Sequence, residues 1–127
     1  MFLGIRTVIY PAPDLAASVA TFTELLGIEP YFNEPFYVGF NVGGFELGLD
    51  PNAPVERGAV SYWGVSNADE AIAQLLEAGA TIEDAVIEPG DGIRIGCVRL
   101  AGTGAVFGVI ENPVFEMKPV VSPGPGL

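Results

Sequence analysis

The stretch from Pro13 to Gly27, PDLAASVATFTELLG, carries the helical pattern that decides the fold. Its apolar residues recur at helical spacing, at Leu15, Val19, Phe22 and Leu26. Asp14 stands where a side chain caps a helix N-terminus, and Gly27 stands where a helix ends. The preceding run IRTVIY, residues 5–10, is rich in β-branched and aromatic side chains. The sequence therefore predicts a strand followed by an amphipathic helix.

The same order recurs later in the chain. Three short strand candidates follow the first helix, in PYFN, FYVGFNV and FELGL, and the first module ends near residue 52. The second module begins with the strand AVSYWGV, which precedes a second helix. Asn67 and Glu70 form a capping box at the start of this helix, and Gly79 ends it. Strands are expected again at 81–87, 93–100 and 105–110, with a hairpin turn at Gly90-Asp91-Gly92. An offset of 53 residues relates Thr7 to Val60 and Asp14 to Asn67, which indicates an internal duplication.

Composition excludes several classes of partner. Five Lys and Arg against sixteen Asp and Glu give a formal net charge of −11, which repels nucleic acid and anionic membranes. No apolar run approaches the length of a membrane span or a signal peptide, so we expect a cytoplasmic protein. The single cysteine, Cys97, lies in an apolar run and is expected to be a small buried residue. Residues 119–127 alternate Pro and Gly, which favours an extended tail.

The duplicated strand, helix and three strands, together with PDLAASVATFTELLG and the later LLEAGA, resemble the vicinal oxygen chelate superfamily, which includes glyoxalases, bleomycin-resistance proteins and extradiol dioxygenases. The resemblance implies an α+β fold of two βαβββ modules whose curled mixed sheets form a cup-shaped cavity. We expect a single domain over residues 1–118, with modules at about 4–52 and 58–115. A homodimer is also implied, and the modules could pair within a chain or between chains.

Metal-dependent proteins of this superfamily hold a divalent ion with His, Glu or Gln on the first and last strands of each module. Carried over by resemblance, the first-strand positions fall on Thr7 and Val60, neither of which is a strong metal donor. The last-strand positions fall on Glu46 and near Gly108, and alternation turns Glu111 to the other face. Because the chain has no His, we predict no resident metal and no other cofactor.

Several side chains are candidates for a ligand site. Glu46 is a carboxylate on an apolar strand, and it faces either the cavity, as a ligand anchor or general base, or open solvent. Tyr62 shares a strand face with Val60 and either stacks on a planar ligand or packs in the core. Phe36, Tyr37 and Phe40 lie on a strand expected to form a wall of the cup.

The two arginines of the run IRIGCVRL differ in their expected roles. Arg94 and Arg99 stand at an odd spacing, so a regular strand turns them to opposite faces. We expect one of them to meet a ligand carboxylate or Glu46 and the other to be a solvated charge at a sheet edge, with Arg94 favoured for the first role.

These observations favour a metal-free protein that binds a small aromatic or cationic ligand in the sheet cavity, at Thr7, Phe40, Glu46, Val60, Tyr62, Arg94 and Gly108. One alternative is a metal-independent isomerase or lyase in which Glu46 is the catalytic base. A second alternative is a metal-dependent enzyme like a glyoxalase or dioxygenase, which the absence of His disfavours. The expected partners are a small molecule and a second copy of the chain.

Overall fold

The computed structural model describes residues 2–112, so the expected tail at 119–127 lies outside the described residues. Two helices and eight strands follow one another in the order β-α-β-β-β, repeated once. The first set comprises β1 (Phe2–Pro11), α1 (Leu15–Leu26), β2 (Phe32–Glu34), β3 (Tyr37–Val42) and β4 (Phe45–Asp50). The second set comprises β5 (Val60–Val65), α2 (Ala68–Glu77), β6 (Thr81–Gly90), β7 (Ile93–Arg99) and β8 (Val106–Glu111). The predicted α+β fold of two βαβββ modules is confirmed.

The chain forms two compact units, one of residues 7–59 and one of residues 60–112 together with residues 2–6. The strand β1 contributes residues to both. In the first unit the strand order is β2-β3-β4-β1, and in the second it is β6-β7-β8-β5. In each unit the first strand pairs in parallel with the last, and the other pairs are antiparallel, so both sheets are mixed.

In the first unit, α1 covers one face of its sheet. The side chain of Asp14 accepts a hydrogen bond from the backbone N–H of Ala17 at 3.1 Å, and Gly27 ends the helix in the left-handed conformation at φ 69°. Both predicted ends of the helix are therefore confirmed. The buried residues on this side of the sheet are Ala12, Val38, Phe40 and Leu49, which pack with Leu15, Val19, Phe22 and Leu26 of the helix.

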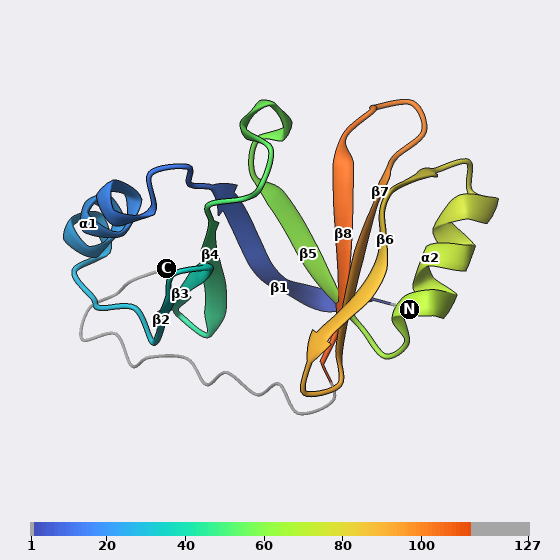
Figure 1. Ribbon diagram of the computed structural model, residues 1–127. Helices are drawn as coiled ribbons and strands as arrows, with labels where there is room; N and C mark the ends of the chain where they lie inside the picture. Colours follow the sequence, from blue (N-terminus) through green and yellow to red (C-terminus); the bar gives the residue numbers. More distant parts are fainter. Residues whose placement is uncertain (1, 113–127) are drawn as a thin grey trace. The chain divides into compact units, whose positions relative to one another are not determined.

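In the second unit, α2 lies alongside its sheet in Figure 1. The helix contacts β6, β7 and β8. Asn67 caps the helix by accepting a hydrogen bond from the backbone N–H of Glu70 at 3.0 Å. The core between helix and sheet contains Val65, Ala68, Ala71, Ile72, Ala80, Val98 and Val109. Cys97 is buried, as expected from its apolar surroundings in the sequence.

Two of the tight turns between antiparallel strands have positive φ at both central residues. Asp91 and Gly92 have φ values of 56° and 74° and join β6 to β7, which confirms the predicted hairpin. Gly43 and Gly44, at 63° and 91°, join β3 to β4 in the same way. Positive φ at both central residues is the requirement of this two-residue turn, and it explains the glycines there.

A short 3-10 helix at Val55–Arg57, in the linker between the modules, was not predicted from the sequence. Within residues 2–112, neither helix is long and apolar enough to cross a membrane.

Candidate functional site

Glu46 on β4 accepts hydrogen bonds from three hydroxyl groups. Its Oε1 atom accepts from Thr7 Oγ1 at 2.9 Å and from Tyr37 Oη at 2.9 Å, and its Oε2 atom accepts from Tyr31 Oη. These side chains come from β1, β3, β4 and the loop before β2. We call Thr7, Tyr31, Tyr37 and Glu46 the Glu46 cluster. It lies on the sheet face opposite α1, since its neighbours Leu47 and Leu49 on β4 pack toward the helix.

Strand register brings the Glu46 cluster together. Thr7 and Glu46 are direct partners in the parallel pairing of β1 with β4, so their side chains are neighbours on one face. Gly39 and Gly48 are direct partners in the pairing of β3 with β4. A Cβ atom on Gly48 would lie 1.9 Å from Tyr37 Oη, and one on Gly39 would lie 2.7 Å from Glu46 Oε2. The two glycines therefore provide the space that the tyrosine ring and the carboxylate occupy.

Both tyrosines of the cluster are held in the protonated form. Burial raises the pKa of Tyr37 well above its ordinary value, and the neighbouring Glu46 carboxylate raises it further. Burial also raises the pKa of Tyr31, and the hydrogen bond to Glu46 adds to the effect. Each phenol therefore remains a hydrogen-bond donor at neutral pH.

The sequence predicted part of this cluster. Thr7 and Glu46 were both candidate site residues, and the structure brings them together. Tyr37 was expected only as part of a wall. Tyr31 was missed because it precedes β2 in a loop, and nothing in its local sequence indicates a contact with a strand 15 residues away.

The structure corrects the prediction for Phe40. This side chain is fully buried among the residues that pack against α1, on the face of β3 opposite Tyr37. Alternation along β3 places Val38 and Phe40 toward the helix, and Tyr37 and Gly39 on the face of the Glu46 cluster. Phe40 is therefore a core residue and does not face a ligand.

The structure also corrects the alignment of Gly108 with Glu46. Tyr62 pairs with Gly108 in the second module, and Ile9 pairs with Gly48 in the first. The caps at Asp14 and Asn67 confirm the offset of 53 residues, which matches Ile9 with Tyr62. Gly108 thus corresponds to Gly48, and the same register matches Glu46 with Val106.

Gly108 provides space for the ring of Tyr62. A Cβ atom on Gly108 would lie 2.4 Å from Cδ2 of that ring, so any larger residue would displace the ring. Val60, two residues before Tyr62 on the same strand, is buried with 4% of its surface exposed. The roles of Val60, Tyr62 and Gly108 in ligand binding stay predictions.

A pocket of about 420 Å³ lies beside Tyr62 in the second unit. Residues of β5, β6 and β7 line it: Tyr62, Glu83, Asp84, Ala85, Ile87, Ile95 and Gly96. Glu83 forms an ion pair with Arg99 at 3.1 Å, and Asp84 accepts a hydrogen bond from Cys97 Sγ at 3.2 Å. The pocket thus combines apolar and aromatic walls with two carboxylates.

Arg94 does not face this pocket. Its guanidinium lies 2.8 Å from Asp69 of α2 and 3.5 Å from Glu88 of β6. Alternation along β7 places Arg94 on the same face as Val98, which packs against α2, and places Ile95 and Cys97 on the face of Tyr62. The prediction that Arg94 meets a ligand or Glu46 is therefore wrong, because its side chain pairs with acidic residues on the helix side.

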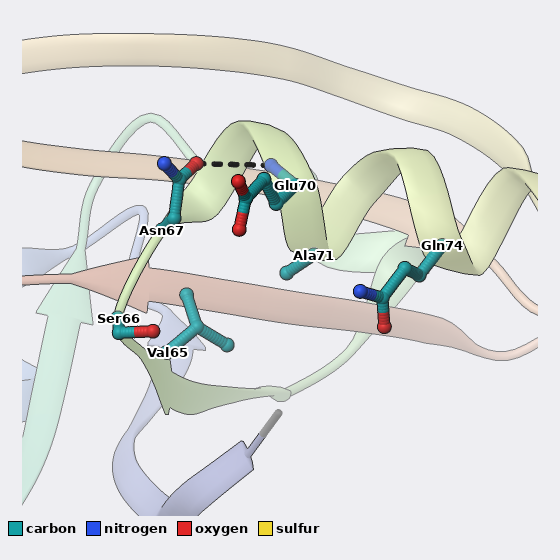
Figure 2. A pocket seen from close by; sticks show the side chains of 6 residues that line it. All are labelled: Val65, Ser66, Asn67, Glu70, Ala71 and Gln74. Atoms are coloured by element: carbon teal, nitrogen blue, oxygen red, sulfur yellow. Dashed lines mark hydrogen bonds between the residues drawn. The ribbon is translucent and has the colours of Figure 1, made fainter.

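A smaller hollow lies at the N-terminus of α2 (Figure 2), with a volume of about 70 Å³. Its lining residues are Val65, Ser66, Asn67, Glu70, Ala71 and Gln74. The backbone N–H groups of Ala68 and Glu70 already donate to Glu111 and Asn67, respectively. As predicted, Glu111 lies on the face opposite the Glu46 position, where it caps the helix. The hollow is too small for a typical organic ligand, which needs about 300 Å³ or more.

Solved structures with this fold are numerous. A glyoxalase/bleomycin resistance protein/dioxygenase superfamily member from Vibrio splendidus matches with a TM-score of 0.64 at 20% identity, over 85% of this chain and 99% of that one. A methylmalonyl-CoA epimerase variant from Streptomyces coelicolor, in complex with 2-nitronate-propionyl-CoA, matches with a TM-score of 0.67 at 17% identity, over 91% and 99%. The chain has the glyoxalase/bleomycin resistance/dioxygenase fold.

A Mn(II)-bound glyoxalase from Novosphingobium aromaticivorans shares the fold with a TM-score of 0.66 at 16% identity, over 96% of this chain and 43% of that one. No protein-family model and no curated protein matches the sequence. At these low sequence identities, the structural likeness establishes only the glyoxalase/bleomycin resistance/dioxygenase fold. The ligand and the activity have to be inferred from the residues of this chain.

The residues at the metal positions of the glyoxalase/bleomycin resistance/dioxygenase fold do not fit a divalent ion. By register these positions are Thr7, Glu46, Val60 and Val106, and only Glu46 is a strong donor. Within residues 2–112, no group of three or more His, Cys, Asp or Glu side chains could hold a metal. The hydroxyls of Thr7 and Tyr37 already occupy one oxygen of Glu46.

Proposed function

We propose that the chain is a metal-free protein that binds a small aromatic or cationic ligand, and that the pocket beside Tyr62 receives it. The pocket carries this proposal because its volume of about 420 Å³ lies in the range of small-molecule sites. Such sites combine apolar walls with a few polar groups that fix orientation. Here Tyr62, Ile87 and Ile95 supply the walls, and Asp84 supplies a carboxylate.

The chemistry of the pocket favours a planar or positively charged ligand. Tyr62 is largely buried, with 9% of its surface exposed, and it lines the pocket, where the accessible part of its ring can contact an aromatic ligand. The Asp84 carboxylate attracts a cation, and the net charge of −11 raises the concentration of cations near the protein. A neutral aromatic compound can still contact the Tyr62 ring. A positive charge on the ligand is therefore expected to increase the affinity without being essential.

The alternative in which Glu46 is the base of a metal-independent enzyme is less well supported. A general base needs an accessible lone pair aimed at the proton that it removes. Two hydroxyls already donate to Oε1 and one to Oε2, so a proton could be taken only at the remaining position on Oε2. A ligand in the pocket beside Tyr62 needs no such vacancy, because Glu46 does not line that pocket.

The first test maps ligand contacts by NMR of isoleucine methyl groups. Aromatic and cationic compounds that raise the melting temperature, with 2-phenylethanol as a neutral reference, are titrated into labelled protein. We expect the methyl resonances of Ile87 and Ile95 to shift, because both line the pocket. Ile72 of α2, which lies in the core between the helix and the sheet, is the internal reference.

Two variants of Tyr62 provide the control. Tyr62→Ala removes the stacking face and should weaken binding about tenfold, whereas Tyr62→Phe keeps the ring and should retain the affinity. Ligands that bind with full affinity to Tyr62→Ala, or that shift Ile72 as strongly as Ile87, would refute the pocket.

A homodimer is proposed as well. In the described residues, β2 and β6 each pair with one strand on one side only, and open sheet edges favour association. Sedimentation equilibrium should give twice the mass of the chain, and a single-chain mass at micromolar concentration would contradict the proposal.

A further inference from the structure

The Glu46 carboxylate retains one position for a further hydrogen bond. A carboxylate accepts about four hydrogen bonds, two on each oxygen. Thr7 and Tyr37 both donate to Oε1, while Tyr31 alone donates to Oε2. The open position is therefore on Oε2, next to Tyr31, whose surface is 53% exposed. The hydrogen bond from Tyr31 lies on the exposed side of the cluster, whereas the two hydrogen bonds to Oε1 are partly buried.

All three donors of the Glu46 cluster are neutral hydroxyls, so none of them brings a positive charge to the carboxylate. In residues 7–59 Arg57 is the only basic side chain, against seven carboxylates. The charge of Asp50 also acts on Tyr37, as the raised pKa of that phenol records. The local field therefore favours a cation over an anion or a neutral group.

Exposed aromatic rings lie next to the cluster. The ring of Phe32 is 6.2 Å from that of Tyr37 and 6.0 Å from that of Phe36, measured between centroids. Phe32 and Phe36 expose 38% and 62% of their surfaces. Aromatic faces attract cations and cover the hydrocarbon part of an organic one.

We propose that the Glu46 cluster binds the primary ammonium group of an organic cation. One N–H donates to Glu46 Oε2, and the others donate to hydroxyl oxygens such as Tyr31 Oη, which accept as well as donate. This site belongs to the first unit and goes beyond the pocket beside Tyr62, so each can be tested without the other.

The geometry selects against other cations. A guanidinium prefers to bind both oxygens of a carboxylate side by side, and the two hydroxyls on Oε1 obstruct that arrangement. A quaternary ammonium has no N–H to donate. A divalent metal prefers several charged or carbonyl oxygens, and the cluster has one carboxylate. A primary ammonium, with three N–H donors, matches one carboxylate oxygen and neighbouring hydroxyls.

The test compares 2-phenylethylammonium with three analogues that carry the same ring: 2-phenylethanol, phenethyltrimethylammonium and 2-phenylethylguanidinium. Binding is followed by backbone amide shifts of Thr7, Tyr31 and Glu46 in ¹⁵N-labelled full-length protein. We expect the primary ammonium to shift these amides with at least about tenfold higher affinity than each analogue, because hydrogen bonds to charged groups are strong.

Three variants separate the site from general charge effects. Glu46→Gln keeps the shape but removes the charge and should weaken binding about tenfold or more. Tyr31→Phe removes one hydroxyl from an exposed ring and should weaken it severalfold without affecting folding. Glu24→Gln removes an exposed carboxylate from α1 and should leave the affinity unchanged.

The proposal is overturned if 2-phenylethanol shifts the cluster amides equally, or if a folded Glu46→Gln or Tyr31→Phe variant binds with full affinity. Shifts confined to Ile87 and Ile95 would also overturn it while supporting the pocket beside Tyr62. Shifts confined to the cluster amides would support it and count against that pocket.

Discussion

Gly48 shows how a residue without a side chain determines the Glu46 cluster. In Gly48→Ala the new Cβ would lie 1.9 Å from Tyr37 Oη and 2.6 Å from Cζ of the same ring, so the ring must move away from Glu46. We expect a loss of about 1–3 kcal/mol in the free energy of unfolding, as for other overpacked sites. Urea unfolding of the variant measures this loss.

The control for Gly48→Ala is a double-mutant cycle with Tyr37→Ala. If the clash with the tyrosine ring causes the loss, Gly48→Ala should cost much less in the Tyr37→Ala background. An equal cost in both backgrounds would show that the strand itself, and not the ring, requires glycine at this position.

At the scale of elements, α2 depends on two caps at its N-terminus. Asn67 accepts from the N–H of Glu70 at 3.0 Å, and Glu111 at the end of β8 accepts from the N–H of Ala68 at 2.8 Å (Figure 2 shows the first contact). Asn67→Ala should cost about 1 kcal/mol in the free energy of unfolding. Circular dichroism during urea unfolding measures it, with Asn67→Asp, which keeps the acceptor, as the matched control.

An Asn67→Asp variant as unstable as Asn67→Ala would contradict the role of the acceptor oxygen. Glu111→Gln tests the second cap in the same assay. It keeps an acceptor but loses the charge that interacts favourably with the helix dipole, so we expect a smaller cost of about 0.5–1 kcal/mol.

Elements were predictable from the sequence to the extent that their signals are local. The cap at Asp14, the ending at Gly27 and the turn at Asp91-Gly92 each follow from the conformational preference of one or two residues. The short 3-10 helix at Val55–Arg57 has no periodic pattern and was missed. Strand β6 extends to Gly90, beyond the expected end at Ile87, because bulged pairing with β7 continues to the turn.

The candidate sites depend on register, which a single sequence specifies only indirectly. Alternation within one strand correctly turned Glu111 to the other face, but it could not assign Phe40 or Arg94 to a face without the neighbouring strands. Tyr31 joins the Glu46 cluster through a loop, so no periodic pattern marks it. Loop contacts of this kind are determined by tertiary packing.

At the scale of the whole molecule, duplication of the fold has not preserved the chemistry of its two modules. The register matches Thr7 and Glu46 with Val60 and Val106, so the polar pair of the first module is replaced by two valines in the second. The position of Ile9 is taken by Tyr62, which borders the pocket of about 420 Å³. One module therefore offers a charged cluster and the other a cavity with a large aromatic wall.

In the alkaline range, the free energy of unfolding should depend on pH because of the two tyrosines of the Glu46 cluster. Their pKa values are raised in the folded state by burial and by Glu46, relative to the ordinary value of 10.0. Below about pH 10 both folded and unfolded chains carry protonated phenols, so the stabilisation is fully present. Above it the unfolded chain loses protons that the folded chain retains, and the free energy of unfolding falls as pH rises.

For a phenol that stays protonated in the folded state, such as Tyr37, this fall approaches about 1.4 kcal/mol per pH unit. Urea unfolding between about pH 8 and 11 measures the slope. Tyr37→Phe cannot titrate and should show a shallower decline, although it is less stable at neutral pH because Glu46 loses a donor. An identical decline in Tyr37→Phe would mean that Tyr37 is already ionised in the folded state at these pH values, and that its hydroxyl does not remain a donor to Glu46.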